Sequence, residues 1–222
     1  MFVNMQRRRF LALTGTGAVG SLAGCGDSGG EEGQSLRKHP AAAGLDGLPR
    51  RGSLDGHAVL TFEDPSCPRC RAFHEDVVPA IQTNIVNPGE GAYILRTYPV
   101  VYQWGEPATQ ALASTYARSD AAFWSLLDHY FSNQDRFDAD TVLARTETFL
   151  DSRTELNGAA VVGDAENEAH SEAVQATLDA ADAADLGRTT PTVLLFRDGQ
   201  YVTSANGSVS YELIAETLGV DS

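Results

Sequence analysis

The sequence predicts an α/β domain in which a β-α-β half and a β-β-α half are separated by a helical insertion. Short apolar runs of the strand type lie near both ends of residues 52–222. The stretch between them, about 105–187, has helical but no strand periodicity. With 222 residues, of which 42% are hydrophobic, the chain can bury a core within one domain.

The first half begins with residues 57–62 (HAVLTF), an apolar run suited to a buried strand, and a turn follows it. Helical spacing then takes over, and Pro68 fits the first helical position, where its missing N–H costs nothing. We expect Pro79 to kink this helix before it continues towards Val86. Residues 92–98 predict the second strand.

The insertion and the second half follow in order. Four helices are expected in the insertion, at 106–117, at 121–132, from an N-cap at Asp140 to about Leu156, and at 165–186 with Gly187 as C-cap. Strand character returns at 192–196 and 201–204, which a hairpin turn at 197–200 would join. Residues 211–218 predict the last helix.

The N-terminus has the pattern of an export signal. Arg7-Arg8-Arg9-Phe10-Leu11 matches the twin-arginine motif, and a mild apolar run follows it. Leu22-Ala23-Gly24-Cys25 is typical of a lipobox, in which Cys25 becomes the lipidated first residue. We therefore expect residues 1–24 to be a signal peptide and the body to be lipid-anchored on the extracytoplasmic face of the membrane. An uncleaved anchor or a soluble basic start remains the alternative.

Residues 25–51 are rich in Gly, Ser, Glu, Pro and Ala. This composition predicts the lipidated cysteine followed by a flexible tether with no core of its own.

The net charge of the chain limits the classes of partner that it can bind. Sixteen basic against thirty acidic residues give a net charge of −14, which argues against nucleic acid as a partner. All but one of the basic residues are arginine, and an acid-rich, lysine-poor chain resembles proteins of salt-loving archaea. An acidic mesophilic protein is the alternative.

The residues Cys67-Pro68-Arg69-Cys70 carry the candidate chemistry. A cysteine at a strand-to-helix junction lies beside the free N–H groups of the helix start, which favour its thiolate. Arg69 adds a positive charge nearby. We expect Cys67 to be the sulfur that forms the mixed disulfide with a substrate, and Cys70, one turn further in, to be shielded and to attack Cys67 in that mixed disulfide.

Two other uses of this motif remain open. Cys67, Cys70, His74 and Glu75 could offer metal ligands, although structural zinc sites usually have a second cysteine or histidine pair. A purely structural disulfide is the other use, although so short a ring constrains an unfolded chain very little. We expect no metal and no organic cofactor, only a redox-active Cys67–Cys70 disulfide.

Three segments together resemble a known family: 62–79 around the two cysteines, 123–134 in the insertion, and 186–196 with its Thr-Pro-Thr. They resemble the DsbA-like thiol–disulfide oxidoreductases of the thioredoxin superfamily, over about residues 49–219. The resemblance implies a thioredoxin-like fold with the helical insertion.

The resemblance also implies that Pro191 is a cis-proline facing the cysteines, with Thr190 offering its backbone to a substrate strand. An ordinary trans proline at a strand start is the alternative. The chain departs from the family in having Arg69 where relatives often have histidine. It also has Thr61 where several relatives have a buried glutamate. Asp64, three residues before Cys67, matches an aspartate of some relatives and is a candidate for proton relay, although an Asx-turn residue is the favoured interpretation.

These expectations describe an exported dithiol oxidase that forms disulfides in extracytoplasmic proteins. The family resemblance implies a membrane partner that reoxidises it, and we expect a monomer. A disulfide reductase or isomerase is the alternative within the class. A metal-binding thioredoxin-like lipoprotein and a non-catalytic binding module are the alternatives outside it.

Overall fold

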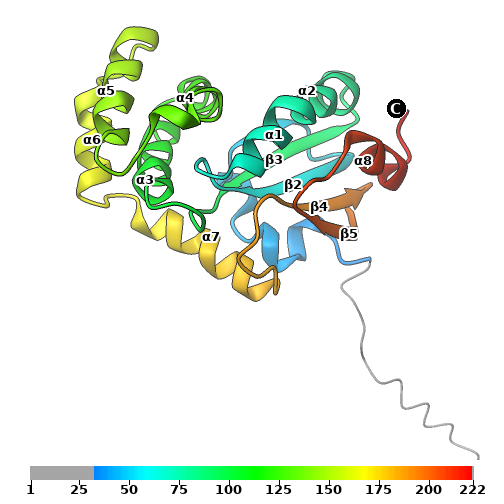
Figure 1. Cartoon of the computed structure of the whole chain (residues 1–222). Coiled ribbons are helices and arrows are strands. Elements are labelled where there is room, and N and C mark those ends of the chain that lie inside the picture. Colours follow the sequence, from blue (N-terminus) through cyan, green and yellow to red (C-terminus); the bar gives the residue numbers. More distant parts are fainter. Residues whose placement is uncertain (1–32, 222) are drawn as a thin grey trace, which may run out of the picture. The chain divides into compact units, whose positions relative to one another are not determined.

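The computed structural model describes residues 33–221, so the predicted signal peptide and Cys25 lie outside the described residues. A five-stranded mixed sheet has the order β1-β3-β2-β4-β5 (Figure 1). Its strands are β1 (Arg50–Gly52), β2 (His57–Glu63), β3 (Gly91–Thr97), β4 (Thr192–Arg197) and β5 (Gln200–Asn206). Strands β2 and β3 are parallel, and the other neighbours are antiparallel.

Both faces of the sheet are buried under other elements. Because successive side chains along a strand point to opposite sides, each strand contributes residues to two cores. Val59 and Leu195 face one core, which α1 (Pro68–Asp76), α2 (Val78–Ile81), the π-turn Gln82–Val86 and α8 (Tyr211–Leu218) cover. Leu60 and Phe196 face the other core. This second face is covered by α7 (Ser171–Ala183) and by the short 3-10 helices Leu36–Lys38, Pro40–Ala42 and Leu45–Gly47 (Figure 1).

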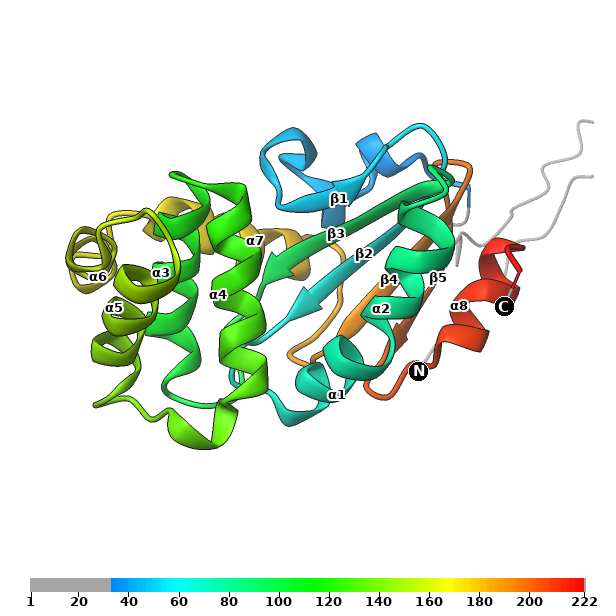
Figure 2. The ribbon, with the colours of Figure 1, turned by 90° about the horizontal axis from the view of Figure 1, so that it is seen from above.

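The helical insertion lies between β3 and β4. It comprises α3 (Gly105–Tyr116), α4 (Asp120–Ser132), the 3-10 turn Gln134–Arg136, α5 (Val142–Arg153), α6 (Gly158–Glu166) and α7. Figure 2 shows α3 to α6 gathered at one end of the sheet, beyond the arrowheads of β2 and β3. The predicted fold class, with its insertion between the β-α-β and β-β-α halves, is confirmed.

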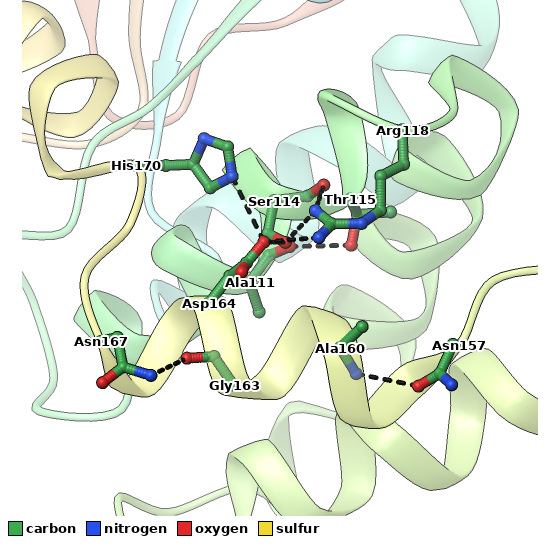
Figure 3. A network of polar contacts seen from close by, with 10 residues as sticks. All are labelled: Ala111, Ser114, Thr115, Arg118, Asn157, Ala160, Gly163, Asp164, Asn167 and His170. Carbon is green, nitrogen blue, oxygen red and sulfur yellow. Dashed lines mark hydrogen bonds and ion pairs between the residues drawn. The ribbon is translucent and has the colours of Figure 1, made fainter.

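Helices α3 and α6 of the insertion are joined by charged groups around Asp164 (Figure 3). Asp164 pairs with Arg118 at 2.6 Å and accepts a hydrogen bond from Ser114 at 2.9 Å. His170, at the start of α7, lies 3.6 Å from the same oxygen. One carboxylate thus ties together three helices.

Three local predictions need correction. Residues 33–51 are not a tether without a core, because Leu36, Ala42 and Leu45 are buried against the sheet and β1 pairs with β3. The helix expected at 165–186 is two helices, separated at Glu168, whose φ is +50°. Asp138 rather than Asp140 accepts the backbone N–H of Thr141 at the start of α5.

Two further features agree with the sequence. The helix after the first strand is interrupted at Val77, between α1 and α2, next to Pro79. The β4–β5 hairpin turns at Asp198 and Gly199, both with positive φ, which is the backbone of a type I′ turn. Within residues 33–221, no helix is both long and apolar enough to cross a membrane.

Candidate active site

Cys67 lies where strand β2 gives way to helix α1. It is the N-cap of α1, and Pro68 occupies the first turn as predicted. The Cys67 sulfur accepts a hydrogen bond from the backbone N–H of Cys70 at 3.4 Å. A cap position leaves the first N–H groups of the helix available to a negative charge, so this sulfur is placed to be stabilised as a thiolate.

A loop from far along the chain faces this sulfur. The Thr190–Pro191 peptide bond is cis, as the family resemblance implied. The Cys67 thiol donates to the backbone oxygen of Thr190 at 3.4 Å. The oxygen of Pro191 is occupied by the N–H of Gly207 at 2.8 Å, whereas neither backbone group of Thr190 forms a backbone–backbone hydrogen bond within residues 33–221.

The two sulfurs have opposite acidity. Hydrogen bonding from Cys70 is the largest cause that lowers the pKa of Cys67, to about 5. Thr190 and the backbone N–H groups of Cys70 and Arg69 act in the same direction, against the effect of burial. Burial raises the pKa of Cys70, and Cys67 and Glu63 beside it raise it further. At neutral pH the outer sulfur is therefore a thiolate and the inner one a thiol.

Glu63 is a functional candidate to which the sequence analysis assigned no role. Its side chain is fully buried, and burial raises its pKa, although His74 and the hydroxyl of Tyr93 oppose the shift. Tyr93 donates to Oε1 at 2.6 Å, and Oε2 has no partner among the described residues. Strand alternation is the sequence signal that could have identified Glu63, because it lies two residues after Thr61 and points to the same face of the sheet. Compared with the relatives that have a buried glutamate at the position of Thr61, the acid is shifted by two residues along the strand.

Asp64 is buried too, but its oxygens are all occupied. Oδ1 accepts from the N–H and the hydroxyl of Ser66 at 2.7 and 2.6 Å. Oδ2 accepts from the N–H groups of Val100 and Val101, both at 2.7 Å. The bond to the N–H two residues ahead makes an Asx-turn, which was the favoured interpretation. Asp64 ties the loop before Cys67 to the loop after β3.

Pro68 and Arg69 are exposed at the start of α1. A methyl group on Gly207 would lie 3.6 Å from Nη1 of Arg69, so this guanidinium lies beside the loop that bonds Pro191. Arg69 acts on the pKa of Cys67 through its backbone N–H. The backbone N–H is the contribution of Arg69 that the structure supports, and the support expected from its positive charge stays a prediction.

A groove of about 520 Å³ adjoins the cysteines. Its lining includes Ser66 and Pro68 on one side and Tyr102, Trp104 and Phe137 on the other. The Tyr102 side chain is 56% exposed, whereas Trp104 is buried and contacts Phe137, with ring centroids 5.3 Å apart. The groove therefore places aromatic rings beside Ser66 and Pro68, which flank Cys67.

The alternative metal set does not come together. Nε2 of His74 lies 2.7 Å from a carboxylate oxygen of Asp128, and its ring packs on Phe131. In the described part of the chain, no three His, Cys, Asp or Glu side chains are grouped as a metal site would need.

Comparisons with known proteins agree with this geometry. A family model described as Thioredoxin matches residues 50–214. The structure resembles BdbD from Bacillus subtilis (TM-score 0.67, 20% identity, covering 79% of this chain and 92% of that one). It also resembles alpha-DsbA1 of Wolbachia pipientis (0.63, 18%, 78% and 89%) and DsbA of Chlamydia trachomatis (0.62, 19%, 78% and 88%). No curated protein sequence matches.

Proposed function

This chain belongs to the thioredoxin family of thiol–disulfide oxidoreductases, and from that premise we propose that it is a dithiol oxidase that forms disulfides in exported proteins. The observation that carries the proposal is the contrast between the two sulfurs of one motif. Cys67 caps helix α1 and has a lowered pKa, whereas burial raises the pKa of Cys70. Stabilising the thiolate stabilises the reduced form, so the disulfide is a strong oxidant.

The reaction passes two electrons from substrate to enzyme. A substrate thiolate attacks the Cys67 sulfur of the Cys67–Cys70 disulfide. The bond between the two enzyme sulfurs breaks, and the electron pair leaves on Cys70. A second substrate thiolate then attacks the substrate sulfur of the mixed disulfide. Cys67 leaves as a thiolate, which its low pKa makes a good leaving group.

Glu63 is the proposed proton source for Cys70. The sulfur of Cys70 has a raised pKa and must take up a proton when it leaves. Burial raises the pKa of Glu63, so its carboxyl keeps its proton to a higher pH than an exposed carboxyl does. The charge of Glu63 raises the pKa of Cys70, and the charge of Cys67 raises the pKa of Glu63. Asp64, with its four hydrogen bonds, has no such role.

Binding would use the backbone of Thr190, which has no backbone partner among residues 33–221, and the aromatic groove along Tyr102 and Trp104. We propose that residues 1–24 direct twin-arginine export and that Cys25 is lipidated. The oxidase would then act, as a monomer, at the extracytoplasmic face of the membrane, in a salt-loving cell to which its charge of −14 is suited. A membrane partner would return the cysteines to the disulfide.

The decisive experiment is redox equilibration of the exported domain with glutathione, read by alkylation of the free thiols. We expect a reduction potential above about −200 mV, as in strong thiol oxidants. A value near about −270 mV, as in reducing thioredoxins, would identify a reductase instead.

Two variants test the rest of the proposal. Cys70→Ala should accumulate mixed disulfides with exported proteins, and Cys67→Ala, as the matched control, should trap none. Replacing Cys25 with serine should move the protein from the membrane fraction to the soluble fraction without changing its redox potential. An unchanged membrane fraction would contradict lipid anchoring.

A further inference from the structure

A cleft of about 760 Å³ between α4 and α5 gathers positive charge. Arg136 enters it from the 3-10 turn, and Arg145 and Arg153 enter it from α5. His129 of α4 stacks on Phe149 of α5, with ring centroids 4.1 Å apart, and both line the same cleft. Its lining contains no aspartate or glutamate.

These three arginines differ from others in the chain. Arg37, Arg71 and Arg118 are each paired with a carboxylate. The side chains of Arg136, Arg145 and Arg153 have no hydrogen bond, ion pair or ring contact with any residue in the range 33–221. The charge of Arg145 contributes to lowering the pKa of Asp138, but the Asp138 side chain already accepts a hydrogen bond from the hydroxyl of Thr141. In a chain of net charge −14, three unpaired guanidinium groups in one cleft favour an anionic partner.

The cleft continues the groove beside the cysteines. Phe137 lines both, and its ring lies 5.3 Å from Trp104 on the groove side and 5.6 Å from His129 on the cleft side. Gln134, two residues before Arg136, donates to the backbone oxygen of Cys67 at 3.0 Å. A polypeptide whose cysteine reacts at Cys67 can therefore extend along the aromatic wall into the arginine cleft.

The spacing of the arginines suits an extended chain. Arg145, Phe149 and Arg153 are four residues apart on one face of α5, so the outer two are separated by about 12 Å along the helix. An extended polypeptide presents alternate side chains on one side about every 6.6 Å, so carboxylates at every second position match this length. Each guanidinium can hold a carboxylate with two hydrogen bonds.

We propose that the cleft formed by Arg136, Arg145 and Arg153 binds acidic segments of the polypeptides that this enzyme oxidises. The proposal rests on the proposed oxidase function and names its substrate class, which is unfolded chains with carboxylates near the reacting cysteine. The enzyme itself has such a composition, with thirty acidic residues.

The test compares two dithiol peptides that are identical except for glutamate or glutamine at alternate positions on one side of the cysteines. The readout is the second-order rate at which each peptide reduces the oxidised enzyme at moderate salt. The variant is R136Q/R145Q/R153Q. The matched control, R37Q/K38Q/R197Q, removes three exposed positive charges elsewhere and so changes the net charge equally.

We expect the wild type and the control to oxidise the glutamate peptide faster than the glutamine peptide, and the cleft variant to lose roughly tenfold on the glutamate peptide alone. An unchanged ratio in the cleft variant, or equal loss in both triple variants, would overturn the inference while leaving the oxidase function intact. Failure of the wild type to oxidise either peptide would refute the oxidase function, and the inference with it.

Discussion

The end of strand β2 and the turn that follows it carry adjacent carboxyl groups, both fully buried, in opposite circumstances. Asp64 in the turn accepts four hydrogen bonds. Glu63 on the strand accepts one, and its second oxygen has no partner in the described chain. The difference teaches that a saturated buried carboxyl group holds the backbone in place, whereas an under-satisfied one that raises the pKa of Cys70 fits the proton transfer that we propose for Glu63.

The largest expected effect concerns the two sulfurs of the motif. In the reduced protein, thiolate absorbance should titrate with a midpoint near pH 5, about four units below the usual thiol value of 9.0. The depressed pKa stabilises the folded reduced form fully above pH 9, and this stability is lost as the pH falls towards 5. Cys67→Ser should remove the transition, since Cys70 stays protonated. A midpoint near 9 would contradict the assigned roles.

In the turn, Asp64→Ala should cost stability rather than chemistry. It leaves three backbone N–H groups without their acceptor, and we expect a loss of roughly 3–5 kcal/mol in the free energy of unfolding. Urea denaturation measures it. Asp138→Ala is the control, because this exposed aspartate makes similar local bonds, and its loss should be much smaller. Comparable losses in the two variants would remove the distinction drawn for Asp64.

Gly105 packs against the turn that Asp64 holds, so a substitution there also tests how tightly this turn is packed. A Cβ at this residue would lie 2.5 Å from Oδ1 of Asp64 and 2.8 Å from the hydroxyl of Ser66. Gly105→Ala should therefore destabilise the fold by about 1–3 kcal/mol. Gly163→Ala, in helix α6 with open space around it, should instead be neutral or slightly stabilising. Thermal or urea unfolding that ranks the two variants equally would contradict this prediction.

The smallest expected effect on stability comes from Glu63→Gln. In the disulfide form, where neither thiol titrates, the two proteins should be similar below pH 4.5. As the pH rises, the unfolded Glu63 ionises while the folded one keeps its proton, so the wild type should lose stability relative to the variant.

Peptide oxidation is the second measurement for this variant. Glu63→Gln should slow it several-fold, because a glutamine has no proton to give to the leaving Cys70 thiolate. An unchanged rate together with a large loss of stability would make Glu63 a structural residue like Asp64.

Local patterns predicted the reactive motif and much of the frame. The strand-to-helix junction at Cys67, the hairpin at Asp198 and the last helix all follow from short-range signals. The cis bond before Pro191 was predicted from the family resemblance alone, because Thr190 and the Cys67 sulfur that it faces are 123 residues apart in the sequence.

Long-range burial explains what was missed. Residues 33–51 read as a polar tether, yet Arg96 of β3 donates to the backbone oxygens of Ala41 and Ala43 and holds this segment against the sheet. No composition rule anticipates a buried arginine that binds carbonyl groups. The availability of Glu63 likewise depends on Tyr93, thirty residues later, and on the helices that cover both side chains.

The packed N-terminal segment has a consequence for reach. Were Cys25 the lipid-bearing residue, only the eight residues up to Gly33 would separate the bilayer from a folded body that already includes Leu36. Eight residues span at most about 28 Å, so Gly33 would stay within that distance of the lipid surface. The oxidase would then act close to the membrane, where exported chains emerge.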